Sequence, residues 1–385
     1  MLTGKKALKN FILWVAAGLL LVAGITVLFD PFYQYHGPLP GMKEVLFERE
    51  SQVIGSIRHF SYDSVLLGSS VVENCDSSYL DNAYGIKTLK VVKGSGSTAD
   101  LMYYLEKAHE KQDIKRVFYG LDLFALKMPC EVTVVSQYSP NYLYTETILD
   151  DGAYLFNKDV LLKKIPLMLA YSFADKNTGG HAYDWSEDKT FGPAKAMEAY
   201  EGPYVQNEES VPGEQDATGA KDASETKDTA GAKNFLPEKD FTEDKETIAA
   251  NIALITEEIK STPDPFYPFF FPPYSLLMWD DTCRQGELSE YCYMLEEALR
   301  ALLSYDNVEI YYFQTDTDIV CNLDFYMDKV HYSPDINQYM LACMVQEEEA
   351  YRIDKDNRQD VVPSLRQMCQ YITEEAIYNY YPREQ

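Results

Sequence analysis

The stretch Val65-Leu66-Leu67-Gly68-Ser69-Ser70 decides the interpretation of this chain, because an apolar run ends there on a glycine followed by two serines. A short apolar run that stops at a turn residue is typical of a buried strand. A serine on a tight turn after such a strand can present its hydroxyl at the edge of a sheet. The stretch therefore predicts a strand with a reactive serine at its carboxyl end.

The residues that follow alternate between strand and helix patterns. Residues 88–92 and 116–119 are two further predicted strands. Between them, Ser97 or Thr98 can cap a helix over residues 99–111, where apolar side chains recur at helical spacing. This alternation indicates a parallel sheet covered by helices. We therefore expect an α/β fold with three α/β/α layers and a mostly parallel sheet.

The second half of the chain continues the pattern. Its last strong strand is predicted at residues 308–313, and its helices are predicted near residues 247–260, 287–304, 336–348 and 364–380. Active sites in parallel sheets lie at the carboxyl ends of the strands. Ser70, Gly96 and Asp122 each follow a predicted strand, so we expect them to border one site.

The N-terminus carries an uncharged apolar run over residues 11–29. Its length is close to the ~20 residues that a helix needs to cross a bilayer. A cleaved signal peptide is the alternative, but its apolar core is usually shorter, about 7–15 residues, and ends at a small-residue cleavage site. Residues 27–31 contain no such site, which favours an uncleaved transmembrane anchor.

The charges that flank this run predict its orientation. Lys5, Lys6 and Lys9 precede it, and Asp30 follows it. The positive-inside rule then places residues 1–10 in the cytoplasm as a short tail. Residues 30–385 are expected outside the membrane as one domain. The chain is thus expected to be a single-pass protein of the cell membrane.

Residues 206–233 differ in composition from the rest of that domain. They are rich in Glu, Asp, Ala, Gly, Ser, Thr and Lys, and their one large aliphatic residue is Val211. Such a segment cannot bury enough apolar surface to offset its ordering entropy. We interpret it as a disordered insertion, because motifs on both sides of it serve the same predicted site.

Charge and cysteine usage limit the partners and cofactors. The formal net charge of −27 repels nucleic acid, so no nucleic-acid partner is expected. The seven cysteines form no CxxC pair and have no nearby histidine ligands, so no metal site is expected. Cys283 and Cys292 are the closest pair that could form a disulfide. Isolated buried thiols are the open alternative.

A second motif, Asp328-Lys329-Val330-His331, lies near the C-terminus. An aspartate three residues before a histidine can lie on the same side of a turn, where its carboxylate can orient the imidazole. The oriented imidazole can then activate a serine. Each motif alone is common in surface turns, but their order and the shortage of other suitable histidines connect them.

The ordered blocks resemble those of the SGNH (GDSL-like) hydrolase superfamily. These blocks are Gly68-Ser69-Ser70 after a strand, the loop at Gly96, Gly120-Leu121-Asp122, and Asp328-x-x-His331, and they span residues 62–345. The chain is similar to the membrane-anchored cell-envelope branch, which includes proteins of lipoteichoic acid D-alanylation and alginate O-acetylation. It also resembles anchored proteins of Gram-positive bacteria in Phe271-Pro272-Pro273-Tyr274-Ser275, a segment that could form a cleft wall or a proline-locked turn.

The resemblance implies a role for each matching residue. Ser70 matches the nucleophile, and Ser69 is its non-nucleophilic neighbour. His331 matches the general base, and Asp328 its orienting acid. The backbone N–H groups of Ser70 and Gly96 match donors to the oxyanion.

Asp122 departs from the family pattern, which usually has an asparagine at this place. An asparagine amide donates to the oxyanion, whereas an ionised aspartate would repel developing negative charge. Asp122 is therefore expected to be protonated, to orient neighbouring loops, or to leave the site without a third donor.

Together these features predict an extracytoplasmic serine esterase or O-acyltransferase that needs no cofactor. Its expected substrate is an ester of an envelope polysaccharide or a teichoic-acid-like polymer, and a membrane-bound acyltransferase is a possible partner. The alternative is a non-catalytic envelope protein that uses the same cleft to bind glycan or a partner.

Overall fold

The computed structural model describes residues 4–135, 140–145, 147, 150–203 and 235–382. The expected disordered insertion at residues 206–233 lies outside the described residues. The strands are β1 (Ser64–Gly68), β2 (Thr88–Val92), β3 (Arg116–Gly120), β4 (Tyr267–Phe271), β5 (Val308–Tyr312) and β6 (Arg352–Ile353). They form one sheet in the order β2-β1-β3-β4-β5-β6. Every neighbouring pair is parallel except β5 and β6, which confirms the α/β class and the mostly parallel sheet.

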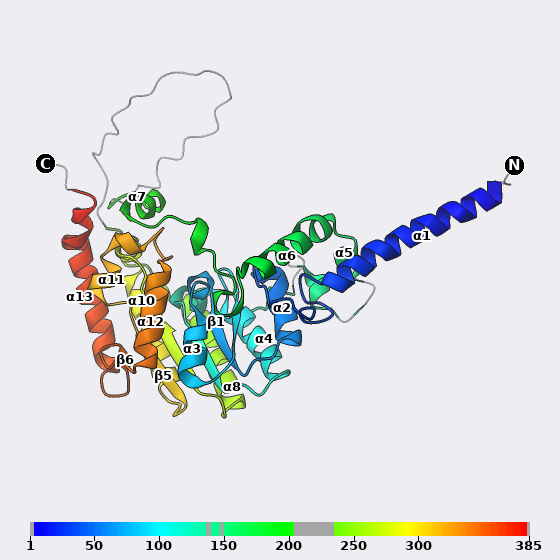
Figure 1. Ribbon diagram of the computed structural model, residues 1–385. Helices are drawn as coiled ribbons and strands as arrows, with labels where there is room; N and C mark the ends of the chain where they lie inside the picture. Colours follow the sequence, from blue (N-terminus) through cyan, green and yellow to red (C-terminus); the bar gives the residue numbers. More distant parts are fainter. Residues whose placement is uncertain (1–3, 136–139, 146, 148–149, 204–234, 383–385) are drawn as a thin grey trace, which may run out of the picture.

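Helices surround this sheet (Figure 1). They are α1 (Gly4–Phe29), α2 (Arg49–His59), α3 (Ser77–Tyr84), α4 (Thr98–His109), α5 (Gly152–Leu155), α6 (Ile165–Ala174), α7 (Pro193–Ala196), α8 (Asp244–Ser261), α9 (Leu276–Arg284), α10 (Leu288–Leu302), α11 (Thr317–Val320), α12 (Pro334–Val345) and α13 (Val361–Glu374). A row of contacts runs from α2 through α4, α8 and α10 to α13, while α3 contacts β2 and α12. The long helix α1 projects away from the rest of the molecule.

Most elements lie where the sequence predicts them. The strand at residues 88–92 has the predicted bounds, and Ser97 caps α4 by accepting the Asp100 N–H at 3.2 Å. The elements that were not predicted are the two-residue strand β6 and helices α2, α3, α5, α6, α7, α9 and α11. The predicted helix over residues 364–380 ends earlier, because α13 stops at Glu374 and a 3₁₀ turn follows over Ala376–Asn379.

Two glycines bring the turn after β1 onto the sheet. An added Cβ at Gly68 would lie 2.9 Å from Val72 Cγ2, and one at Gly120 would lie 2.5 Å from Val72 Cγ1. Both distances are too short for a side chain, so glycine is required at both strand ends for Val72 to pack there. This packing sets the position of the Ser70–Val72 turn at the carboxyl edge of the sheet.

The cysteines were expected either to include a Cys283–Cys292 disulfide or to be isolated thiols, and the structure shows thiols. All seven are free thiols, so Cys283 and Cys292 form no disulfide. Four of them are buried, as expected for small apolar side chains in a core. Stability of this domain therefore rests on packing and hydrogen bonds.

Candidate active site

The predicted nucleophile opens a 3₁₀ turn over Ser70–Val72, directly after β1. Ser69 precedes it in extended conformation, and its Oγ accepts the Val71 N–H at 3.5 Å. Because β1 and β3 are parallel, Ser69 and Ser70 emerge at the same edge of the sheet as Asp122, which follows β3. Strand register therefore brings the first half of the predicted site to one edge of the sheet.

The structure brings Ser70, His331 and Asp328 together. His331 Nε2 lies 2.8 Å from Ser70 Oγ, and its Nδ1 lies 2.7 Å from Asp328 Oδ2. Both distances are within hydrogen-bond reach. The His331 and Asp328 side chains are each 24% exposed, so solvent reaches the pair only partly. The predicted contact of His331 with Ser70 is confirmed, and a catalytic role stays a prediction.

The turn that carries His331 is held by the aspartate itself. Asp328 Oδ1 accepts the Val330 and His331 N–H groups, both at 2.8 Å. Burial disfavours ionisation of Asp328, but the hydrogen bonds from the His331 ring and from these two N–H groups outweigh it and lower its pKa. An ionised Asp328 keeps the proton of a neutral His331 on Nδ1, which leaves Nε2 free to accept the Ser70 proton.

The Phe-Pro-Pro-Tyr-Ser segment connects both halves of the site. Ser275 donates its N–H and its hydroxyl to the Lys329 carbonyl, at 3.0 and 2.9 Å. These two hydrogen bonds hold the Asp328–His331 turn against the Ser275 segment. The preceding Tyr274 hydroxyl donates to Asp122. The segment is thus a connector that β4 positions.

Asp122 is buried, with 3% of its surface exposed. Burial raises its pKa, and hydrogen bonds from Ser69 and Tyr274, with the nearby His331, oppose the rise. The raised pKa favours the protonated form, one of the three alternatives expected for Asp122. Because its carboxyl group accepts from these two hydroxyls, Asp122 orients the residue next to the nucleophile.

The predicted oxyanion role of Gly96 is wrong in this structure. The Gly96 N–H donates to the Lys93 carbonyl at 2.9 Å, so it is not available to an oxyanion beside Ser70. This bond closes a four-residue turn in which Ser95 has a φ of +47°, as the third residue of a type II turn requires. The Gly96 N–H, which the family pattern assigns to the oxyanion, is thus already hydrogen-bonded within the local turn.

One predicted donor remains. The Ser70 N–H has no hydrogen-bond partner among the described residues, so it can donate to an oxyanion formed at Ser70. Within that same part of the chain, no cluster of His, Cys, Asp and Glu has the arrangement of a metal site.

Trp185 belongs to the site but was not predicted. Its Nε1–H donates to the Ser70 carbonyl at 3.2 Å, and its ring meets that of His331 edge-on, with centroids 5.6 Å apart. Its backbone N–H donates to Asn74 Oδ1 at 3.1 Å. Trp185 lies 115 residues from Ser70 in the chain and in no motif, so no sequence signal could have identified it.

A buried lysine forms hydrogen bonds both to the segment before Trp185 and to the segment after the Ser70 turn. Lys90 on β2 is 1% exposed, and its Nζ donates to the carbonyls of Glu73 and Ala182, at 2.7 and 2.9 Å. Burial lowers its pKa to about 8. Lys90 therefore links the segment that contains Glu73 to the segment that contains Ala182.

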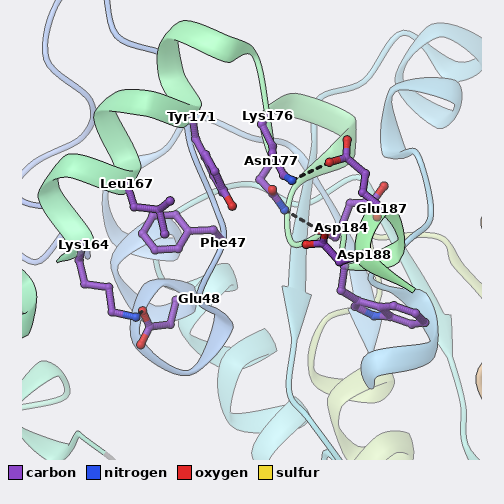
Figure 2. A pocket seen from close by; sticks show the side chains of 11 residues that line it. Phe47, Glu48, Lys164, Leu167, Tyr171, Lys176, Asn177, Asp184, Glu187 and Asp188 are labelled. Atoms are coloured by element: carbon purple, nitrogen blue, oxygen red, sulfur yellow. Dashed lines mark hydrogen bonds and ion pairs between the residues drawn. The ribbon is translucent and has the colours of Figure 1, made fainter. Parts of the chain in front are cut away.

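Trp185 also lines a cavity of about 260 Å³. Figure 2 shows Lys164, Leu167 and Tyr171 on one helix, across from Phe47 and Glu48. Charged side chains border it in pairs, with Lys164 bound to Glu48, and Lys176 at 2.6 Å from Glu187. Its mixed aromatic and charged walls suit a polar ligand with an apolar face.

Replacing Asp122 by asparagine should change how stability depends on pH. Between the ordinary pKa of an aspartate and the raised pKa of Asp122, the folded chain holds a proton that the unfolded chain has released. The free energy of unfolding should therefore fall as pH rises through this window, by about 1.4 kcal/mol for each pH unit that the window spans. Asparagine does not ionise, so Asp122→Asn should gain stability relative to the wild type as pH rises.

The measurement is chemical unfolding of the full chain in detergent at pH 4 and pH 7. Asp264→Asn, at an exposed aspartate, is the matched control and should leave the pH dependence unchanged. Parallel pH dependences of wild type and Asp122→Asn would contradict the prediction.

Comparison with known proteins identifies no family. No family model matches the chain, and no curated protein matches it. One solved structure, "a putative platelet activating factor from Streptococcus pneumonia", aligns with 78% of this chain and 91% of its own. The identity is 12% and the TM-score 0.35, and a likeness this weak does not establish a shared fold.

Proposed function

We propose that this protein is a membrane-anchored serine esterase or O-acyltransferase of the SGNH type. The observation that carries the proposal is the continuous hydrogen-bonded series Ser70–His331–Asp328, with steps of 2.8 and 2.7 Å. The three-layer arrangement of that superfamily is part of the proposal. It is supported by β1 and β4, which are buried at every position, as in sheets covered on both faces.

The geometry suits acyl transfer through a covalent intermediate. Ser70 Oγ attacks the ester carbonyl while His331 Nε2 takes its proton, and Asp328 stabilises the imidazolium. The Ser70 N–H donates to the oxyanion. The imidazolium then protonates the leaving alcohol, and water or an acceptor hydroxyl releases the acyl group. These steps use neither a metal nor an organic cofactor.

The proposed location follows from α1. This helix has 26 residues, is rich in apolar side chains and is largely exposed, so by length and composition it can cross a membrane. With Lys5, Lys6 and Lys9 on the cytoplasmic side, the site would face the outside. An ester of an envelope polysaccharide or a teichoic-acid-like polymer is the proposed substrate, with a membrane-bound acyltransferase as the proposed partner.

A non-catalytic role has two specific observations in its favour. The Gly96 N–H is already bonded to Lys93, and Asp122 stands where the family pattern has an amide donor. Two of the three expected oxyanion donors are thus missing, and each such donor contributes about 10²–10³ in rate in a serine protease. The same cleft would then bind an envelope glycan or a partner.

Labelling with a fluorophosphonate probe tests the proposed function. The probe reacts with serines that a neighbouring base activates, so the full chain in detergent should form a covalent adduct on the peptide that contains Ser70. His331→Ala should reduce the labelling rate strongly, because Ser70 then loses its base. Absence of an adduct on correctly folded protein would favour the binding role.

A further inference from the structure

We propose that the outer face of the α6 region is a second membrane contact, which lies on the outer surface of the same bilayer that holds α1. This surface is a stripe made of Leu162, Pro166, Leu169, Ala170 and Phe173, which we call the α6 stripe. The inference rests on the proposed anchor, and it adds a lipid surface as a direct partner of the outer domain.

The α6 stripe is a continuous apolar face of one helix. The chain is helical from residue 158 to 174, through a π turn over Val160–Lys164 into α6. Stripe residues recur at intervals of three and four, so they share one side of the helix. Leu162 is 70% exposed and Phe173 is 90% exposed. Exposed apolar surface of this extent indicates an interaction site.

The opposite side of the same helix faces the protein core. Val160, Ile165 and Met168 are at most 5% exposed, so burial of that side already accounts for the folding of the segment. The apolar residues of the stripe are not needed for that core. Their exposure therefore calls for a partner outside the described chain.

The position of α1 identifies the partner. Thr26 Oγ1 in the last turns of α1 donates to the Leu155 carbonyl at 3.1 Å, and the Tyr154 hydroxyl donates to Asp30 Oδ1 at 2.7 Å. Helix α5, which carries these two partners, leads directly into the α6 region. Figure 1 shows α5 and α6 beside the end of α1.

The depth of this contact places the stripe at the bilayer surface. The uncharged residues 11–29 span about 28 Å as a helix, close to the ~30 Å hydrocarbon thickness. Thr26 lies four residues before Asp30, about 6 Å along the axis. Leu155, which Thr26 contacts, therefore lies within about 6 Å of the boundary between hydrocarbon and headgroups.

The local charge suits such a surface. The helical residues 158–174 contain three lysines and one aspartate, in a chain with net charge −27. Lys158 and Lys163 are exposed beside the stripe, and Lys163 also pairs with Asp159 at 2.9 Å. Apolar side chains flanked by lysines are typical of helices that lie in a membrane interface and contact anionic headgroups. A bilayer thus fits this patch better than an acidic protein surface does.

The arrangement has a consequence for the active site. The inward side chains Lys164, Leu167 and Tyr171 line the cavity beside Trp185 (Figure 2). Helix α6 would then have the bilayer on one face and this cavity on the other. A substrate that enters the cavity would meet it at the level of the lipid headgroups.

Photocrosslinking of the full chain in vesicles of phosphatidylcholine and phosphatidylglycerol tests the contact. Benzoylphenylalanine in place of Phe173 should form lipid adducts that mass spectrometry detects. The same group in place of Leu20, which is 73% exposed on α1, is the positive control. In place of Tyr371, 42% exposed on α13 and remote from α1, it should form none.

The outcomes separate this inference from the proposals on which it rests. Lipid adducts at position 20 but not at 173 would overturn the α6 contact and leave the anchor intact. Adducts at 173 between two copies of the chain would also overturn it. Absence of adducts at both positions would remove the anchor as well. Fluorophosphonate labelling of Ser70 in each variant reports the fold and the proposed chemistry independently.

Discussion

Replacing Ser70 by alanine should reduce ester turnover at least about 10³-fold. Ser70 Oγ is the proposed nucleophile, so its loss removes the proposed covalent step and not merely a binding contact. A 10³-fold change corresponds to about 4 kcal/mol in the barrier. A loss of this size distinguishes catalysis from a modest change in affinity.

The fold should survive this substitution. Ser70 is half-buried, and its side chain loses one hydrogen bond, to His331 Nε2, which costs about 1 kcal/mol. The Ser70 carbonyl, which accepts from Trp185 Nε1, is unchanged. The measurements are turnover of a chromogenic ester by the full chain, and its melting temperature.

Ser261→Ala, at an exposed serine at the end of α8, is the matched control and should keep full turnover. If Ser70→Ala keeps ester turnover near the wild-type rate, the proposed mechanism is excluded. Binding of an envelope glycan that persists in Ser70→Ala without any turnover in the wild type would favour the binding role.

Replacing Asp328 by asparagine should reduce turnover about 10²–10⁴-fold. The amide oxygen can still accept the Val330 and His331 N–H groups, so the turn should keep its shape. The amide nitrogen then faces His331 Nδ1 and donates to it. This contact favours the tautomer with its proton on Nε2, which cannot accept the Ser70 proton.

This variant separates orientation of the base from folding of the turn. Asp324→Asn, four residues earlier and exposed, is the matched control and should leave turnover unchanged. The measurement is turnover together with the rate of fluorophosphonate labelling at Ser70, and both should fall in parallel. A wild-type labelling rate in Asp328→Asn would show that Asp328 does not orient His331.

Elements with local signals could be located from the amino-acid pattern. Continuous apolar runs with a glycine at the end located β1 and β3, because a buried strand needs apolar side chains on both faces. The same reasoning located α4, whose cap Ser97 acts three residues away. The spacing of Asp328 and His331 predicted their contact, since three residues suffice to close a turn.

The contact between Ser70 and His331 could not be predicted from local signals alone. It joins residues 261 positions apart, and it was predicted from the order of the motifs and from their resemblance to a family. Asp122 was expected to border the same site as Ser70, because the carboxyl ends of parallel strands lie at one edge of a sheet.

Which groups at the site are free to act depends on hydrogen bonds that the motifs do not encode. The Gly96 N–H is taken by Lys93 in a local turn, and a family pattern does not report such competition. Lys90 and Trp185 join the site through contacts across 92 and 115 residues. Their hydrogen-bond acceptors are backbone carbonyls, which every residue carries. The identity of the side chains along the sequence therefore does not indicate these contacts. Packing of distant segments alone brings a particular carbonyl to a particular donor.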